Sequence, residues 1–461
     1  MTNKLFTFTV LLALITGLGC QEQITEPAYI DVDMSVVMSA PNTISAPDDI
    51  ISPIPANRQP TGTISLSEAL LWAWGYNPEL ATFPPQVLQA QAAQLQASLR
   101  PNPELEYEME EFAGSGDLRG FDSVVNKLHV SQLWETAGKR TKRERAAAMD
   151  IELVKWDYQS RRLEVTVQVT KSYLEILAAQ QRVALAQELA GISEKVLAAV
   201  RKRVEAGKDS PVEESRARVV LANFRIELRR AEAALQSSLR HLAATWGSQN
   251  ITFDAAEGTL ESLSKTPIAA QQIPLLEQLQ KLLDQNPDLA RWQAQIEKYQ
   301  RVIELEKAKS VADPAVGAGI HHFNESGDAG LRFQLEIPVQ LFDRNQAGVS
   351  AAKHQLAQAH LERCATLNHL DAALFEIYQS LSAAQSVVKM LQTDSLPYVQ
   401  QAFDAATLGY QEGKFDYLVV LDAQRTLFEA RGQYIEALKM YHQALAEIER
   451  LIGGPLFNHN N

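Results

Sequence analysis

Two long helical segments limit most strongly how this chain can fold. Residues 141–207 and 347–413 have helical composition over 67 positions each, and Pro397 is their only proline. At a rise of 1.5 Å per residue, a helix of that length spans about 100 Å. Since no compact domain has that diameter, we predict two extended rods packed along the other helices of the chain.

Short motifs recur at a nearly constant offset, which indicates an internal two-fold sequence repeat. Asn77-Pro78 recurs as Asn286-Pro287, 209 residues later, and Gly207-Lys208 recurs as Gly413-Lys414, 206 residues later. Each repeat is predicted to contain an opening helix, two strands and two long helices. The predicted division is a signal peptide (1–19), an N-terminal tether (20–62), a first repeat (63–247), a linker (248–273), a second repeat (274–454) and a C-terminal tail (455–461).

Between the opening and long helices, each repeat alternates polar with bulky apolar residues. In the first repeat, glutamates occupy the even positions 104–110 and apolar residues the odd positions between them. Side chains two apart share one face of a strand, so each strand has a polar and an apolar face. Turn sequences at 114–117 and 325–328 join the strands into one hairpin per repeat. The predicted polar-face residues are Glu104, Glu106, Glu108, Glu110, Arg332, Gln334 and Glu336.

The last helix carries two apolar seams on neighbouring faces. A two-stranded coiled coil needs one seam, so two seams indicate a helix with a neighbour on each side. Such helices form a layer, and a closed layer is a tube. The first seam contains Ala423, Leu427, Ala430, Tyr434, Ala437, Tyr441, Ala444 and Ile448, and the second contains Leu421, Phe428, Ile435, Leu438, Leu445 and Ile452.

The N-terminus reads as a secretory signal that ends at Cys20. The sequence Gly17-Leu18-Gly19-Cys20 resembles a bacterial lipobox, so Cys20 is predicted to carry lipid, and Gln21 permits outer-membrane sorting. The alternative is a cleaved signal with an incidental cysteine. Cys364, the other cysteine, lies in a helical pattern and is predicted to be a buried apolar residue.

Composition and motifs count against several classes of protein. The net charge of −13 argues against nucleic acid as a partner. No nucleophile context, phosphate loop or pair of catalytic acids is recognisable, so no enzyme and no cofactor are predicted. The nine histidines lack ligand spacing, and the adjacent His321 and His322 point to opposite faces of a strand, so no metal site is predicted.

Four strands cannot close a membrane barrel, for which at least about eight are needed. Three copies would supply twelve. We therefore predict an α+β membrane protein in which a trimer completes a twelve-stranded barrel joined to the long helices. The apolar strand faces would contact lipid, and the seven polar-face residues would line a water-filled lumen.

Several motifs resemble the TolC-type outer-membrane channels of tripartite efflux pumps, in particular the CzcC-like heavy-metal branch. The resemblance covers residues 65–454 in order. It implies a homotrimer with a long periplasmic helical barrel, a periplasmic adaptor, an inner-membrane proton-driven pump of the RND type, and no catalytic site. The motifs are NPEL from Asn77, PNPELEYEMEEFAGSG from Pro101, ETAGKR from Glu135, LEIPVQLFDRNQAG from Leu335 and YQEGKFDYLVVLDAQRTLFEARGQYIEAL from Tyr410.

The two repeated turns are expected at the far end of the helical tube. Gly207-Lys208 and Gly413-Lys414 reverse the long helices, so they would form the periplasmic tips that meet the adaptor. By resemblance, Asp422 matches an aspartate that rings the closed aperture in this family, while Val419 stands where the family has a second one. The alternative is a solvated aspartate that favours the helix dipole.

A basic cluster marks the start of the first long helix. Cations at a helix start oppose its dipole, so an offsetting partner is expected. Phospholipid head groups of the outer membrane are one candidate, and a solvated helix start is the other. The cluster contains Lys139, Arg140, Lys142, Arg143 and Arg145.

Three functions remain open from the sequence. The first is an outer-membrane export channel for divalent heavy-metal cations, opened by the adaptor and pump. The second is the same channel serving organic solutes or drugs. The third is a periplasmic coiled-coil scaffold without a pore, which the alternating hairpins disfavour because a scaffold needs no lipid-facing strands.

Overall fold

The computed structural model describes residues 59–263 and 267–456. The predicted signal peptide, Cys20 and nearly all of the tether lie outside these residues. Within the described part, no helix combines the length and apolar character that a membrane span requires. The order of helix, two strands and long helices that was predicted from the sequence occurs twice along the chain.

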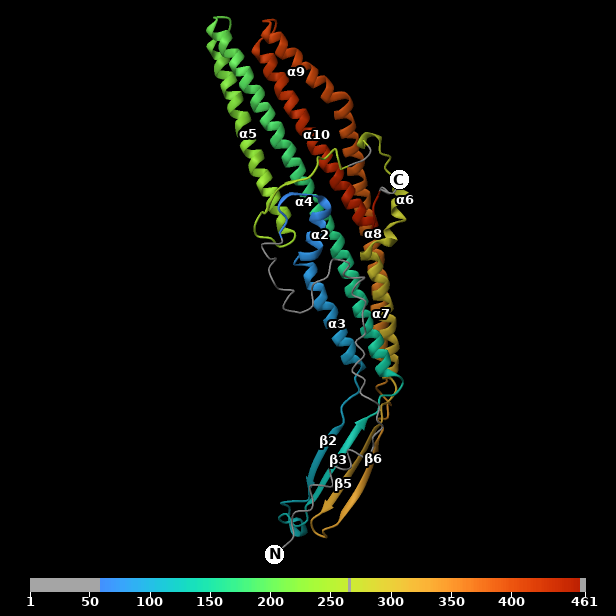
Figure 1. Cartoon of the computed structure of the whole chain (residues 1–461). Helices are drawn as coiled ribbons and strands as arrows, with labels where there is room; N and C mark the ends of the chain where they lie inside the picture. Colours follow the sequence, from blue (N-terminus) through green and yellow to red (C-terminus); the bar gives the residue numbers. More distant parts are fainter. Residues whose placement is uncertain (1–58, 264–266, 457–461) are drawn as a thin grey trace. The chain divides into compact units, whose positions relative to one another are not determined.

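The main elements lie close to their predicted positions (Figure 1). Both opening helices, all four strands and the helices that follow them are present. The first set comprises α3 (Phe83–Ser98), β2 (Glu104–Glu110), β3 (Val125–Leu133), α4 (Lys139–Glu205) and α5 (Pro211–Ala244). The second comprises α7 (Pro287–Lys309), β5 (Ala315–Phe323), β6 (Ala329–Glu336), α8 (Gln346–Met390), α9 (Leu396–Gln411) and α10 (Tyr417–Ile452).

Smaller elements flank these sets and were not predicted. The helix α2 (Leu66–Tyr76) begins with a capping box, in which Ser65 and Glu68 each accept from the other's backbone N–H. The strand β1 (Gly62–Ile64) pairs in parallel with β4 (Phe253–Ala256). Short turns complete the set: η3 (Leu80–Thr82), η4 (Gly116–Leu118), η5 (Ile268–Ala270), α6 (Leu276–Gln280) and η6 (Leu283–Gln285).

The two long rods differ in continuity. The first, α4, runs for 67 residues without a break. The second is divided into α8 and α9 by η7 (Leu391–Ser395), a π-helical turn in which the Leu396 N–H bonds to the Leu391 carbonyl five residues back. Pro397 explains the turn, because proline lacks an N–H and its ring clashes with the carbonyl four residues earlier in a regular helix. The wider turn accommodates both defects.

The four strands form one antiparallel sheet in the order β2-β3-β5-β6. Each predicted hairpin is present, and β3 pairs with β5 to join the two hairpins. The strand β6 ends at Glu336, so the apolar residues Ile337 and Val339 lie beyond it. The β2 and β6 strands are the two edges of the sheet.

Helix α10 packs against α4, α8 and α9, which confirms neighbours on more than one side. Its first seam supplies buried Leu427, Tyr441 and Ile448. The large core joins α2, α4, α8, α10 and the segment between the repeats. A smaller core lies near the ends of α4, α5, α9 and α10 and contains Val200, Phe403, Tyr410, Tyr417 and Val420, among others.

One local prediction needs correction. Cys364 is exposed and not buried as predicted. The prediction failed because helical composition alone does not show which face of α8 lies against other helices. At the start of α5, the side-chain cap is a single hydrogen bond. Ser210 accepts from the Val212 N–H at 3.3 Å, while Glu213 accepts from Arg216 at 3.0 Å. Pro211 does occupy the start of the helix, where its missing N–H costs nothing.

Candidate functional site: the polar sheet face and the helix tips

The register of the sheet gathers all seven predicted polar-face residues on one side. Directly opposed residues in antiparallel strands point to the same face. One row runs Glu106, His129, Gly319 and Arg332 across the four strands. The neighbouring rows contain Glu104 with Gln334 and Glu108 with Lys127 and His321, and Glu336 opposes Ala315.

Basic side chains on β3 lie beside the glutamates of β2. Lys127 forms ion pairs with Glu110 and, at 3.6 Å, with Glu108. The His129 Nε2 atom lies 3.1 Å from the Glu106 carboxylate. Sequence reasoning missed Lys127 and His129 as members of this face. Lys127 and His129 are two residues apart and therefore share one face of the strand. That spacing, combined with the pairing register, would have placed them opposite the glutamates.

The opposite face of the sheet is apolar and open. Leu105 is 70% exposed and Phe333 is 82% exposed, although both lie in regular strands. A contiguous group of exposed large apolar side chains usually marks a surface that contacts another apolar surface. This face includes Leu105, Tyr107, Met109, Leu128, Val130, Val316, Ile320, Leu331, Phe333 and Leu335.

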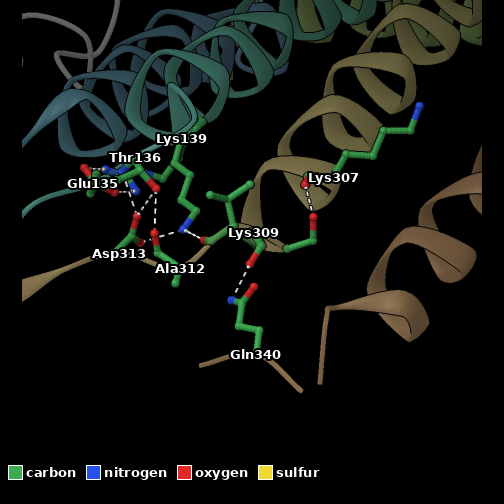
Figure 2. A network of polar contacts seen from close by, with 11 residues as sticks. Glu135, Thr136, Lys139, Lys307, Lys309, Ala312, Asp313 and Gln340 are labelled. Carbon is green, nitrogen blue, oxygen red and sulfur yellow. Dashed lines mark hydrogen bonds and ion pairs between the residues drawn. The ribbon is translucent and has the colours of Figure 1, made fainter. Parts of the chain in front are cut away.

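A polar network fixes the start of α4 to the chain that enters β5 (Figure 2). The Lys139 ammonium pairs with Asp313 at 2.7 Å and also donates to the Val311 carbonyl. Thr136 donates from its backbone N–H to Asp313 and from its hydroxyl to the Ala312 carbonyl, both at 2.7 Å. Burial raises the pKa of Asp313, but the bonds from Lys139 and Thr136 outweigh it and hold that pKa below its usual value.

The same network provides partners for two cations of the basic cluster at the start of α4. Arg143 donates to the Glu135 carboxylate at 2.6 Å and to the Ala97 carbonyl at 2.8 Å. Lys139 and Arg143 therefore have partners within the chain, which offset part of the positive charge at the start of α4. Figure 2 shows Glu135, Thr136, Lys139 and Asp313 converging from the start of α4 and the segment before β5.

The two repeated turns have the same backbone geometry. Gly207 has φ of 70° and Gly413 has φ of 76°, in the left-handed region that glycine adopts without steric cost. The Lys208 N–H bonds to the Arg203 carbonyl and the Lys414 N–H to the Gly409 carbonyl, both at 2.8 Å. These bonds close Schellman-type helix ends and leave both lysines exposed.

A second network, absent from the sequence predictions, ties the two turns together. Arg203 pairs with Asp209 at 2.9 Å, and its guanidinium lies 4.9 Å from the centre of the Tyr410 ring. The Tyr410 hydroxyl donates to Asp209 at 2.7 Å. The Arg203 hydrogen bond is the main cause that holds the pKa of Asp209 below its usual value, and burial raises the pKa of Tyr410.

The predicted aperture residues lie near the start of α10. Val419 and Asp422 are exposed, whereas the intervening Val420 is buried in the smaller core. The nearby Arg425 pairs with Glu429 at 2.8 Å and not with Asp422. Val419 and Asp422 are three residues apart on one helix, so they occupy adjacent positions of one face.

In the described residues, no group of three or more His, Cys, Asp or Glu side chains is arranged to hold a metal ion. The polar sheet face instead distributes its carboxylates along β2. Such an arrangement provides a charged surface.

Comparison with known proteins gives a family match over most of the chain. A family model described as "Outer membrane efflux protein" matches residues 77–248 and 278–454. The chain is 33% identical over 427 residues to the cobalt-zinc-cadmium resistance protein CzcC of Cupriavidus metallidurans, covering 92% of this chain and 99% of that protein. It is 24% identical to the nickel-cobalt-cadmium resistance protein NccC of Alcaligenes xylosoxydans xylosoxydans, covering 65% and 67% of the two chains.

Solved structures share the fold at lower identity. A crystal structure of CusC superposes with a TM-score of 0.68 at 20% identity, covering 90% of this chain and 99% of CusC. The outer membrane protein VceC of Vibrio cholerae gives a TM-score of 0.68 at 18% identity, covering 85% and 97%.

Proposed function

Because the chain belongs to the outer membrane efflux protein family, we propose that it is the outer-membrane channel of a tripartite system that exports divalent heavy-metal cations. The observation that carries this proposal is the two-faced sheet attached to long helices, in a chain 33% identical to a cobalt-zinc-cadmium resistance protein. The channel is a passive conduit. A periplasmic adaptor and an inner-membrane RND pump supply the opening and the driving force.

A trimer explains the open edges of the sheet. Unpaired edge strands expose backbone donors and acceptors, and a closed barrel removes such edges altogether. In three copies, β2 of one chain pairs with β6 of the next and yields twelve strands. Antiparallel pairing continues around the ring, because β2 and β6 run in opposite directions within the four-stranded sheet.

The faces of the sheet determine which side meets lipid. The exposed apolar face contacts the membrane, and the polar face lines the lumen. Each chain places five carboxylates on the polar face, from Glu104, Glu106, Glu108, Glu110 and Glu336, against the two permanent cations of Lys127 and Arg332. Three such surfaces around one axis focus a negative potential, which raises the local concentration of cations.

The helices carry the conduit toward the adaptor. The turns at Gly207-Lys208 and Gly413-Lys414 form the adaptor-facing tips in this proposal. Asp422, with Val419 one turn away, narrows the periplasmic aperture. Three aspartates near a symmetry axis repel one another unless a cation or hydrogen-bond donors intervene. Lipid on Cys20 adds a second anchor to the outer membrane.

The cargo is tested in cells that contain the cognate adaptor and pump. Deleting this chain should increase cellular cobalt, zinc or cadmium during metal challenge, and the wild-type chain should restore export. A variant with Glu106, Glu108 and Glu110 changed to Gln should assemble and restore less export. If deletion changes the accumulation of organic solutes and leaves metals unaffected, the organic-solute channel replaces this proposal.

A further inference from the structure

One pair of side chains on the polar face of the sheet combines two ligand types that transition-metal cations prefer. The His129 Nε2 atom lies 3.1 Å from the Glu106 carboxylate, and the two residues are directly opposed on β3 and β2. Imidazole nitrogen and carboxylate oxygen are both common ligands of zinc and related divalent cations. The pair therefore offers one nitrogen ligand and one oxygen ligand at a short separation.

The separation of these two atoms matches the bite of a tetrahedral metal ion. Zinc lies about 2.0–2.1 Å from an imidazole nitrogen and about as far from a carboxylate oxygen. At the tetrahedral angle, two such ligand atoms stand about 3.3 Å apart. The observed 3.1 Å differs by about 0.2 Å, which is within the tolerance used for metal-ligand distances. A cation between the two atoms thus requires no movement of either strand.

A glycine on the neighbouring strand makes room for the histidine. His129 opposes Gly319 on β5, and a Cβ atom on Gly319 would stand 2.5 Å from the Cβ atom of His129. Glycine inside a strand often marks such a close approach. The His129 side chain is 12% exposed and the Glu106 side chain is 55% exposed. The imidazole is therefore packed into the sheet surface, while the carboxylate faces the solvent on the polar side.

The other histidine of the polar face has different surroundings. His321 opposes Lys127, whose ammonium pairs with Glu110 and Glu108. A cation at His321 would therefore meet a permanent positive charge on the opposed residue, which repels it. At His129 the opposed residue is a carboxylate. The two histidines thus differ in their suitability as cation ligands, although they share one face.

The pair supplies two ligands, and water supplies the rest. Two protein ligands bind a cation more weakly than the three or four of a resident zinc site. Conduction requires such a balance, because an ion must bind well enough to enter a pore and weakly enough to leave it. Arg332 lies in the same row beyond Gly319, and its positive charge weakens cation binding further.

We propose that His129 and Glu106 form a transient coordination site for zinc-like divalent cations in the wall of the channel. The inference rests on the proposed function and names the residues that recognise its cargo. The cation takes the place of the proton on the His129 Nε2 atom. That proton passes to water from an imidazolium, or to Nδ1 in a neutral imidazole. Mg²⁺ does not bind in this way, because it prefers oxygen ligands.

Equilibrium dialysis against Zn²⁺ measures the site in the full-length protein in mild detergent. A Cys364→Ser background removes the exposed thiol of the described residues. In that background the chain should bind about one more Zn²⁺ ion than its His129→Gln variant, and excess Mg²⁺ should not displace this ion. His321→Gln is the matched control, because it removes a histidine from the same face and should leave Zn²⁺ binding unchanged.

A thiolate in place of the carboxylate gives a spectroscopic reading of the same pair. In the Cys364→Ser background, Glu106→Cys should bind Co²⁺ with a sulfur-to-metal charge-transfer absorption, since thiolate is also a metal ligand. Loss of a partner of a metal ligand already lowers affinity about 10–100-fold, so adding His129→Gln should raise the Co²⁺ concentration required by at least about tenfold. The control Glu108→Cys opposes Lys127, and His129→Gln should not change its response to Co²⁺.

The outcomes separate this inference from the proposed function. Zn²⁺ binding and Co²⁺ absorption that both depend on His129 support the site. Equal Zn²⁺ binding with and without His129→Gln, or an absorption independent of His129, overturns it. The channel proposal survives that result if deletion of the chain still raises cellular zinc. If deletion affects only organic solutes, the proposed function fails and the site has no role in transport, whatever Zn²⁺ the purified protein binds.

Discussion

The first and second long rods follow one plan, but only the second has a proline at one matched position, and only the second is interrupted there. Where α4 has Gly191, the second rod has Pro397, 206 residues later, which is the offset between the repeated glycine turns. The first rod stays α-helical through this position, and the second contains a π-helical turn just before it. The comparison teaches that a single residue decides whether a rod of this length is continuous.

The part of the second rod beyond the π-helical turn consequently relies on contacts with α10 and with the first rod. Beyond the π-helical turn, α9 is held by the smaller core, to which Phe403 and Tyr410 contribute together with Val196 and Val200 of α4. Arg203 and Asp209 add the polar contacts. The first rod continues from the large core to the smaller one without a break, so its outer part is also held by its own helix.

The largest effect on stability is expected from placing a proline in the first rod at the position that matches Pro397. Gly191→Pro introduces into α4 the defect that α9 tolerates, without a π-helical turn to receive it. We expect a loss of about 3 kcal/mol or more in the free energy of unfolding. Thermal unfolding in detergent measures it.

The control for that variant is Gly191→Ala. A Cβ at Gly191 meets no atom within 4 Å, so Ala should stabilise the protein by about 0.5–1 kcal/mol through helix propensity. If Gly191→Pro is as stable as wild type, the continuity of α4 does not contribute to stability. The proposed difference between the two rods is then wrong.

The contact between the rods at the tips should have an intermediate effect. Tyr410→Phe keeps the buried ring and removes the hydroxyl that donates to Asp209 at 2.7 Å. The loss should be about 1–2 kcal/mol, because hydrogen bonds to charged groups contribute more than neutral ones. A double-mutant cycle with Asp209→Asn measures the coupling. Full additivity of the two changes would show that the bond does not join the rods.

The acid stability of this contact follows from the lowered pKa of Asp209. A carboxyl whose pKa is lower in the folded state than in the unfolded state stabilises the fold above the unfolded value. That stabilisation disappears as the pH falls from the ordinary value of 3.8 through the lower folded value. The stability difference between wild type and Asp209→Asn should thus be constant from pH 7 to about 5 and shrink below about 4. A difference that grows toward low pH contradicts the assignment.

The smallest expected effect concerns local opening of the second rod. The π-helical turn at residues 391–395 interrupts the regular α-helical hydrogen-bond ladder, whereas the matched residues of α4 lie in an uninterrupted helix. Amide hydrogen exchange should be faster at residues 391–396 than at 185–190. Equal protection of the two segments would show that the turn does not weaken the rod.

The sequence predicted the regular parts of this molecule because their signals are periodic. The alternation at 104–110 was sufficient to assign β2 and its polar face, and the uninterrupted helical composition of 141–207 predicted α4 to within two residues. The turns at Gly207 and Gly413 were found because glycine marks a left-handed helix end. Each of these signals lies within a short window of the chain.

The parts that escaped prediction depend on contacts between distant residues. Arg203 and Tyr410 are 207 positions apart, and nothing local in either segment indicates that they meet. The exposure of Cys364 depends on which face of α8 lies against other helices. Pro397 was noted in the sequence, but the π-helical turn that it causes requires knowledge of the backbone around it.

The most direct test of the central claim is the mass of the particle extracted from the outer membrane in mild detergent, measured by native mass spectrometry. The account predicts three copies of the chain in one particle, because three four-stranded sheets are needed to close a barrel of twelve strands. A stable monomer under these conditions contradicts the barrel, the shared lumen and the channel function together.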